Sequence, residues 1–256
     1  MRKLDLRLFR LIKSSKGQFI SILTVITLAL AIYISSSMTA INLEDSVEGY
    51  YRETNLADLT VMAINIPDEA LIDIGNIDGV KEVQGRIVED FPLLVEDGDE
   101  RVNVRIISMP SQYNRINKLY MQSGREIEGK SKEAIVIQQF ANARGIELGD
   151  KITPLIYGVP HQLEVVGVGS SSEYSYLVEK EETLLPADKD FGVIYVNETI
   201  VRNILNYYDG LNQLLIKVED DSVIENIVKA VESHISHHGL ISILKQNEIL
   251  SVQLEF

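Results

Sequence analysis

The chain has 256 residues, with 38 acidic and 24 basic side chains, a formal net charge of −14 and no cysteine. The acidic balance argues against nucleic acid as a partner, because binding to phosphates needs basic patches. The lack of cysteine excludes disulfides, thiolate metal sites and cysteine nucleophiles, and an apolar content of 45% excludes a disordered chain.

Charge changes abruptly near the start of the chain. Residues 1–17 hold six basic side chains and one acid, whereas residues 18–41 hold no charge. A helix of this uncharged length measures about 36 Å, enough to cross a hydrocarbon core of about 30 Å. Basic residues beside such a span stay on the cytoplasmic side. These residues are Arg2, Lys3, Arg7, Arg10, Lys13 and Lys16.

We therefore expect a protein of the plasma membrane with a cytoplasmic N-terminus. Residues 1–17 have the leucine spacing of a basic amphipathic helix that lies on membrane lipid, although the same charges could serve only as a topology signal. Residues 18–41 form the transmembrane helix, and residues after about 42 are extracytoplasmic. A cleaved signal peptide and a buried helix of a soluble protein remain alternatives, but the apolar stretch exceeds a signal core.

The next segment predicts a helix followed by a first β-α-β-β run. Residues 42–54 contain no proline and continue the membrane helix as a stalk. The elements expected after it are a strand over 57–64, a short helix opened by Pro67, and β-rich stretches over 80–95 and 101–109 that Asp97-Gly98 joins as a hairpin.

Residues 111–208 have a different texture, rich in short strands and turns. The expected elements are a polar turn-rich stretch over 111–130, strands over 133–138, 151–157, 161–168 and 193–196, a short helix over 139–144, a loop over 170–190, and a helix from Asn197 to about 208.

The last segment repeats the first pattern. A strand is expected over 211–218 and another over 241–244. Between them, an amphipathic helix from 221 places Val223, Ile227, Val231 and Ile235 on one face. The whole is an α+β fold in which 55–110 and 209–246 form one subdomain and 111–208 a β-rich insertion. Residues 247–256 are expected to form a return helix towards a second membrane span.

The familiar motifs of nucleotide and hydrolase sites are missing: there is no GxxxxGK[ST], GxGxxG, HExxH or GxSxG. His234, His237 and His238 have the spacing of metal ligands on a helix, but no nearby carboxylate completes the set, and we expect a solvated helix end without a metal. A loop with exposed aromatic and acidic side chains is the candidate contact for a partner or substrate, with packing and solvation as the alternative. Its residues are Tyr174, Tyr176, Glu179, Glu181 and Glu182.

Glycines mark the joints between the expected strands and helices. At such joints glycine supplies a positive φ or a close approach of two backbones. The residues expected to shape these structural turns are Gly124, Arg125, Gly145, Gly149, Asp150 and Gly167.

Several segments in a fixed order carry a family resemblance. The basic head with LIKSSKGQFISIL is followed by YYRETNLADLTV, GREIEGKSKEAIVI, ARGIELGD, VVGVGSSSEYSYL and FGVIYV. This series resembles the N-terminal part of an FtsX/MacB-like ABC transporter permease. Ile127 stands where that family often has proline.

The resemblance implies a porter-like extracytoplasmic subdomain with a β-rich insertion. It also implies a cytoplasmic ABC ATPase as partner, which binds the ATP, and a second permease copy or paralogue. The chain itself would be no enzyme and would hold no cofactor or metal; it would couple ATP-driven motion to export or mechanotransmission. Because family permeases have three further transmembrane helices, we expect a fragment or a truncated relative. A single-pass anchored binding module is the alternative, and a hydrolase that uses His237 is a third.

Overall fold

The computed structural model describes residues 15–95, 101–110, 116–129, 131–174, 188–207 and 209–246. The chain forms two compact units, Met1–Tyr50 and Tyr51–Phe256. Helix α2, Lys16–Glu53, runs without interruption through the predicted span and stalk. Among the described helices it alone is long and apolar enough to cross a membrane, judged by length and composition.

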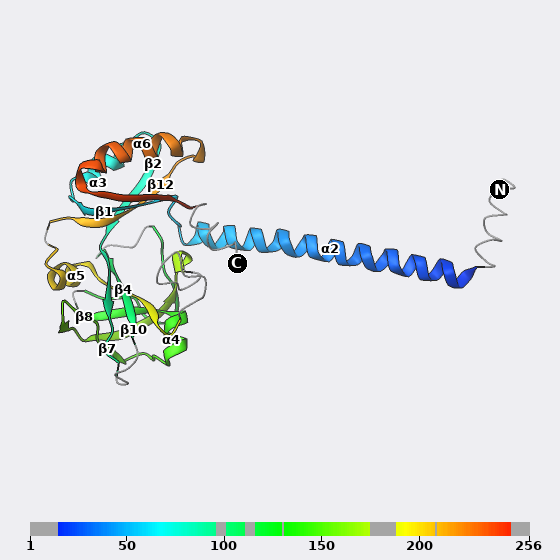
Figure 1. Ribbon diagram of the computed structural model, residues 1–256, viewed down its shortest axis with the longest axis horizontal. Coiled ribbons are helices and arrows are strands. Elements are labelled where there is room, and N and C mark those ends of the chain that lie inside the picture. Colours follow the sequence, from blue (N-terminus) through cyan, green and yellow to red (C-terminus); the bar gives the residue numbers. More distant parts are fainter. Residues whose placement is uncertain are drawn as a thin grey trace. The chain divides into compact units, whose positions relative to one another are not determined.

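The second unit contains a four-stranded antiparallel sheet in the order β13-β1-β12-β2. Helices α3 and α6 cover one face of it (Figure 1). Since β12 lies between β1 and β2, the order is that of two split β-α-β units. The bounds are β1 Leu59–Ile66, α3 Ala70–Gly75, β2 Val80–Arg86, β12 Leu211–Val218, α6 Ile224–Ile235 and β13 Leu240–Lys245, with single-turn helices η2 Asp221–Val223 and η3 Ser236–His238.

A seven-stranded mixed sheet is built from the residues between β2 and β12. Its order is β3-β4-β11-β6-β10-β5, with β7 paired to β10. The bounds are β3 Val88–Pro92, β4 Asn103–Met109, β5 Tyr120–Gly124, β6 Glu133–Ile137, α4 Gln138–Arg144, β7 Lys151–Ile152, β8 Leu155–Ile156, β9 Val159–Pro160, β10 Leu163–Ser170, η1 Ser172–Tyr174, β11 Phe191–Asn197 and α5 Glu198–Leu205.

The predicted α+β class is therefore confirmed, but three local predictions are wrong. The continuous stretch 80–95 breaks at Ile87, so that β3 and β4 join the seven-stranded sheet and the chain divides near residue 87 instead of residue 110. The turn-rich stretch 111–130 contains β5, which pairs with β10. The strand expected over 151–157 is interrupted at Thr153 and Pro154; Pro154 has no N–H for a ladder and forms only an isolated bridge with Leu93.

Helix ends follow the local signals more closely. The side chain of Asn197 caps α5 by accepting a hydrogen bond from the Thr199 N–H at 3.0 Å, as predicted. The helix ends at Leu205, three residues early, because Asn206 adopts a left-handed φ of 55°. Ile227, Val231 and Ile235 of α6 are buried on one face, as their spacing predicts. The amphipathic helix expected over 1–17 lies outside the described residues except for its end, and the return helix over 247–256 lies wholly outside them.

Gly192 in the central strand β11 offers a test of core packing. A Cβ at this position would lie 2.5 Å from the ring of Phe140. Gly192→Ala should therefore lower the free energy of unfolding by about 1–3 kcal/mol through overpacking, measured by urea unfolding in detergent.

Gly75→Ala is the matched control, because nothing lies within 4 Å of its added Cβ. It should be neutral or stabilise the fold by up to about 1 kcal/mol. Equal effects of the two substitutions would contradict the packing of α4 against β11.

Candidate functional site

Helix α2 ends in a hydrogen-bonded cap. Asn55 has a φ of 50°, which asparagine tolerates better than most residues. The Leu56 N–H donates to the Tyr51 carbonyl at 2.9 Å, and the Asn55 N–H to that of Arg52 at 3.2 Å. This is the Schellman pattern, and it turns the chain out of the helix at a defined residue. The five residues that follow, Thr54–Asp58, are named the anchor segment.

One side of the anchor segment bonds to the four-stranded sheet. The buried carboxylate of Asp58 accepts from Lys217 Nζ at 2.5 Å and from the Val218 N–H at 2.7 Å. Asn55 Nδ2 donates to Glu82 Oε2 at 3.1 Å. The anchor segment is thereby attached to both β12 and β2.

The other side bonds to segments of the seven-stranded sheet. The Thr54 carbonyl accepts from the Lys118 N–H at 2.7 Å, and that of Asn55 from the Asn117 N–H at 3.0 Å, just before β5. The Thr54 hydroxyl donates to Ser172 Oγ of η1 at 3.1 Å. The residues immediately after α2 therefore contact both sheets.

A buried ion pair lies next to this attachment. Arg86, the last residue of β2, donates to both carboxylate oxygens of Glu173 in η1. Its Nε–H donates to Gln213 Oε1 of β12. Such a two-pronged pair fixes the relative direction of its partners as well as their distance. The pair joins the two sheets, since β2 belongs to the four-stranded sheet and η1 directly follows β10 of the seven-stranded sheet.

The charges of this pair affect the groups around it. Burial alone would lower the pKa of Arg86, but the charge of Glu173 and the hydrogen bonds to it raise that pKa above its usual value. Burial is the main cause that raises the pKa of Tyr174, and the charge of Glu173 is the second. The same two causes raise the pKa of Tyr195 still further. Both phenols are therefore neutral, and the Arg86 guanidinium is charged, at physiological pH.

A second arginine lies close to the same cluster. Arg105 of β4 forms two hydrogen bonds of 2.8 Å with Asp90 of β3, and its guanidinium lies 5.2 Å from the ring centroid of Phe191. These contacts hold Arg105 beside the edge strand β3 of the seven-stranded sheet, and the carboxylate of Asp90 balances its charge.

Of the loop residues that the sequence singled out, only Tyr174 can be placed. It lies in η1, half-buried beside the ion pair. Tyr176, Glu179, Glu181 and Glu182 lie outside the described residues, so their predicted contact with a partner or substrate stays a prediction. The basic residues Arg2, Lys3, Arg7, Arg10 and Lys13 also lie outside, and Lys16 is exposed at the start of α2.

The predicted turn residues lie at the ends of strands and helices of the seven-stranded sheet, except Gly167, which lies inside β10 between β5 and β6. Gly124, Gly145 and Gly149 have φ angles of 78°, 67° and 89°. At Gly124 a Cβ would also lie 2.2 Å from the Val166 carbonyl oxygen, so no other residue fits there. At Gly167 a Cβ would lie 2.6 Å from the Arg125 carbonyl oxygen.

The two polar turn residues fix neighbouring backbone. Arg125 forms a two-pronged pair with Glu133, and its hydrogen bonds lower the pKa of that carboxyl to about 2. Asp150 Oδ2 accepts from the Glu147 N–H at 2.8 Å and closes the turn before β7.

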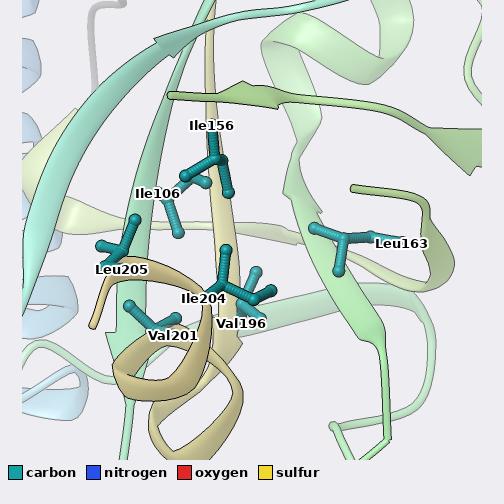
Figure 2. A pocket seen from close by; sticks show the side chains of 7 residues that line it. All are labelled: Ile106, Ile156, Leu163, Val196, Val201, Ile204 and Leu205. Carbon is teal, nitrogen blue, oxygen red and sulfur yellow. The ribbon is translucent and has the colours of Figure 1, made fainter. Parts of the chain in front are cut away.

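No metal centre is evident in the part of the chain that the structure describes. No three His, Asp or Glu side chains there are grouped as metal ligands, His234, His237 and His238 included. A cavity of about 10 Å³ lies between α5 and the seven-stranded sheet, and its lining is aliphatic (Figure 2). That volume is near the minimum for one water, and no polar group would hold it.

None of the sequence patterns pointed to Arg86 or Asp58. Asp58 is the one charge in a stretch expected to form a strand, and Arg86 is one of five charges in another, where charged side chains are usually solvated. Ser172 and Glu173 stand in the quoted segment VVGVGSSSEYSYL, but nothing local links them to residues 54 or 86. A charge inside an apolar alternation is the signal that could have marked the cluster.

The buried pair can be tested by a double-mutant cycle. Arg86→Met should cost about 3–5 kcal/mol of unfolding free energy, because the Glu173 carboxylate stays buried and loses both of its hydrogen bonds from Arg86. Adding Glu173→Leu should restore most of the loss, since no buried charge then remains. Urea unfolding of both variants in detergent measures this.

Asp90→Asn is the matched control. Its pair with Arg105 is more exposed, so the loss should stay below about 1 kcal/mol. A double variant as unstable as Arg86→Met would contradict the pairing.

The sequence and the structure were compared with known proteins. The family profile described as "MacB-like periplasmic core domain" matches residues 21–234. A comparison with curated proteins gives no match. Two similar solved structures are the periplasmic region of MacB from Actinobacillus actinomycetemcomitans and the extracellular domain of the noncanonic ABC-type transporter YknZ from Gram-positive bacteria.

The first is 13% identical with a TM-score of 0.49, covering 82% of this chain and 99% of that one. The second is 16% identical with a TM-score of 0.46, covering 73% and 100%. The family profile spans most of α2 and the strands of both sheets up to β12, and ends near the end of α6. The chain belongs to the family of MacB-like periplasmic core domains.

Proposed function

We propose that this chain is part of an ABC transporter permease subunit that couples the motion of a partner ATPase to its extracytoplasmic unit. Family membership supports a transporter component, and together with the apolar helix α2 it indicates a membrane-anchored protein with an extracytoplasmic domain. The N-terminus is cytoplasmic in this proposal, and residues after about 42 are outside.

The observation that carries the coupling is the anchor segment. Residues 54–58 directly follow α2 and bond to both sheets. A hydrogen bond resists displacement over only a few tenths of an ångström, because it weakens steeply with distance and angle. Displacement of the end of α2 would therefore act on both sheets together, without passing through a flexible linker.

The proposal assigns no bond chemistry to this chain. ATP would be bound and hydrolysed by a cytoplasmic ABC ATPase, and a second permease copy or paralogue would complete the assembly. In the cluster around Arg86, each charge faces an opposite charge or a hydrogen-bond partner from the protein itself, which suits positioning better than catalysis.

A pull-down tests the transporter component. The natively expressed protein, isolated in mild detergent, should bring down an ATPase with Walker motifs, identified by mass spectrometry. Recovery of the bait without an ATPase would contradict the proposal and favour a single-pass membrane-anchored binding module.

A flexible insertion tests the coupling. Four Gly/Ser residues between Glu53 and Thr54 should separate α2 from the anchor segment while leaving ATPase binding intact. A fluorophore on Lys118→Cys, beside the Thr54 carbonyl, should respond to ATP with vanadate in the parent protein and lose that response with the insertion.

The same insertion between Gly158 and Val159, in the exposed turn of the β8–β9 hairpin, is the control and should preserve the response. A response that survives the insertion after Glu53 would show that α2 does not drive the unit.

A further inference from the structure

The two sheets are connected by a narrow crossing. Among the described strands, the chain passes between the sheets twice, at Ile87 and between α5 and β12. Ile87 is fully buried, and it exchanges two hydrogen bonds with Ser108, one through the hydroxyl at 2.8 Å and one through the backbone at 2.9 Å. One residue therefore separates a strand of one sheet from a strand of the other.

The two crossings are also bonded to each other. The Asn212 side chain accepts from the Val88 N–H and donates to the Val88 carbonyl, each at 2.8 Å, in the manner of a neighbouring strand. Gly210 has a φ of 126°, and a Cβ there would lie 2.2 Å from Asn65 Oδ1. The chain thus passes the crossing as two adjacent strands without a bulky side chain at Gly210.

Several further contacts join the sheets outside the crossing, among them those of the anchor segment with residues 117 and 118 and the hydrogen bond from the Ile116 N–H to Gln84 Oε1 at 3.1 Å. Two sets of side-chain contacts bear on a movement between the sheets. The first is the Arg86–Glu173 pair described above, with Thr54–Ser172 beside it. The second, which we name the α5 latch, comprises Arg202 Nη2 to Asp68 Oδ1 at 2.9 Å and the Tyr207 hydroxyl to the Ile64 carbonyl at 2.8 Å. Arg202 belongs to α5, and Tyr207 lies just after it, whereas Asp68 and Ile64 belong to the β1–α3 region.

The two sets differ in burial. The side chains of Arg86 and Glu173 are 4% and 14% exposed, whereas those of Arg202 and Asp68 are 18% and 52% exposed. Opening the buried pair would separate two charges in a place that water does not reach, at a high cost in free energy. When a pair at the surface opens, water replaces the lost contacts and the cost in free energy is small.

Arg202 also keeps other partners when Asp68 leaves. Its Nε–H donates to Glu198 at 2.8 Å, and its Nη1 to the Gly210 carbonyl at 3.0 Å. Release of Asp68 therefore leaves no buried charge without a partner, and the freed carboxylate is hydrated. The α5 latch can therefore open while the contacts of Arg202 with Glu198 and Gly210 stay intact.

We propose that the two sheets are rigid bodies joined by a hinge at Ile87 and Gly210, and that the α5 latch holds this hinge closed. The Arg86–Glu173 pair, together with the anchor segment beside it, is the pivot that persists in both positions. The hinge stands on these contacts alone; its use in transmitting the motion of α2 rests on the proposed function.

Distance measurements between spin labels test the hinge in the full chain, in detergent and without an ATPase. The chain has no cysteine, so labels can be placed at will. Ile72→Cys in α3 with Lys151→Cys in β7 spans the two sheets, and both positions are exposed. Ile72→Cys with Lys229→Cys in α6, and Lys132→Cys with Lys151→Cys, are controls within one sheet each.

Asp68→Asn should raise the population of a second inter-sheet distance about two- to fivefold, the factor that a surface ion pair supports. Salt at about 1 M should do the same in the parent protein, because it screens exposed charges. Asp73→Asn, an exposed acid of α3 with its charge outside the α5 latch, is the control and should leave the distances unchanged.

An inter-sheet distance unaffected by Asp68→Asn and by salt would overturn the hinge. Changes in the distances within either sheet would also overturn it, because they would indicate local unfolding. Neither result depends on an ATPase, so failure of the hinge is distinguishable from failure of the proposed coupling, which the insertion after Glu53 tests separately.

Discussion

The arrangement of the second unit depends on the buried ion pair between Arg86 and Glu173. Removing two charges from water costs several kcal/mol for each ion unless their hydrogen bonds are completed inside the protein. Here both carboxylate oxygens of Glu173 accept from Arg86, and Gln213 accepts the remaining Nε–H. These bonds form only when β2, β12 and η1 occupy their places. The pair therefore fixes the point at which β2, β12 and η1 meet, and about which the two sheets can turn, more than it adds net stability.

The anchor segment shares η1 with this pair. Ser172 accepts from Thr54 at the end of α2, and the next residue, Glu173, binds Arg86. A displacement of Thr54 would therefore reach the ion pair across one peptide bond. Asp58, four residues further on, attaches the same segment to β12. The end of α2 thus lies beside the interaction that joins the two sheets, which is the position that the proposed coupling requires.

Local patterns were sufficient to predict much of the fold. The helical spacing of Ile227, Val231 and Ile235 predicts α6, and Asn197 as a capping residue predicts the start of α5. Two errors arose where pairing partners outweighed local preference. β5 has little strand character of its own and exists because β10 lies beside it. The stretch 80–95 has strand character throughout, and only the partners on either side of Ile87 assign its halves to different sheets.

The candidate site was beyond local patterns because its partners are far apart in the sequence. Arg86 and Glu173 are separated by 87 positions, and Thr54 and Ser172 by 118. A single sequence shows that each of these residues is polar, but not which distant group meets it. In an enzyme's active site, charged catalytic groups usually face a cavity that a substrate can enter. Here the buried charges face one another across two sheets, so their burial is better explained by positioning. In the proposed function, the five residues after α2 would bring the displacement of that helix to these charges.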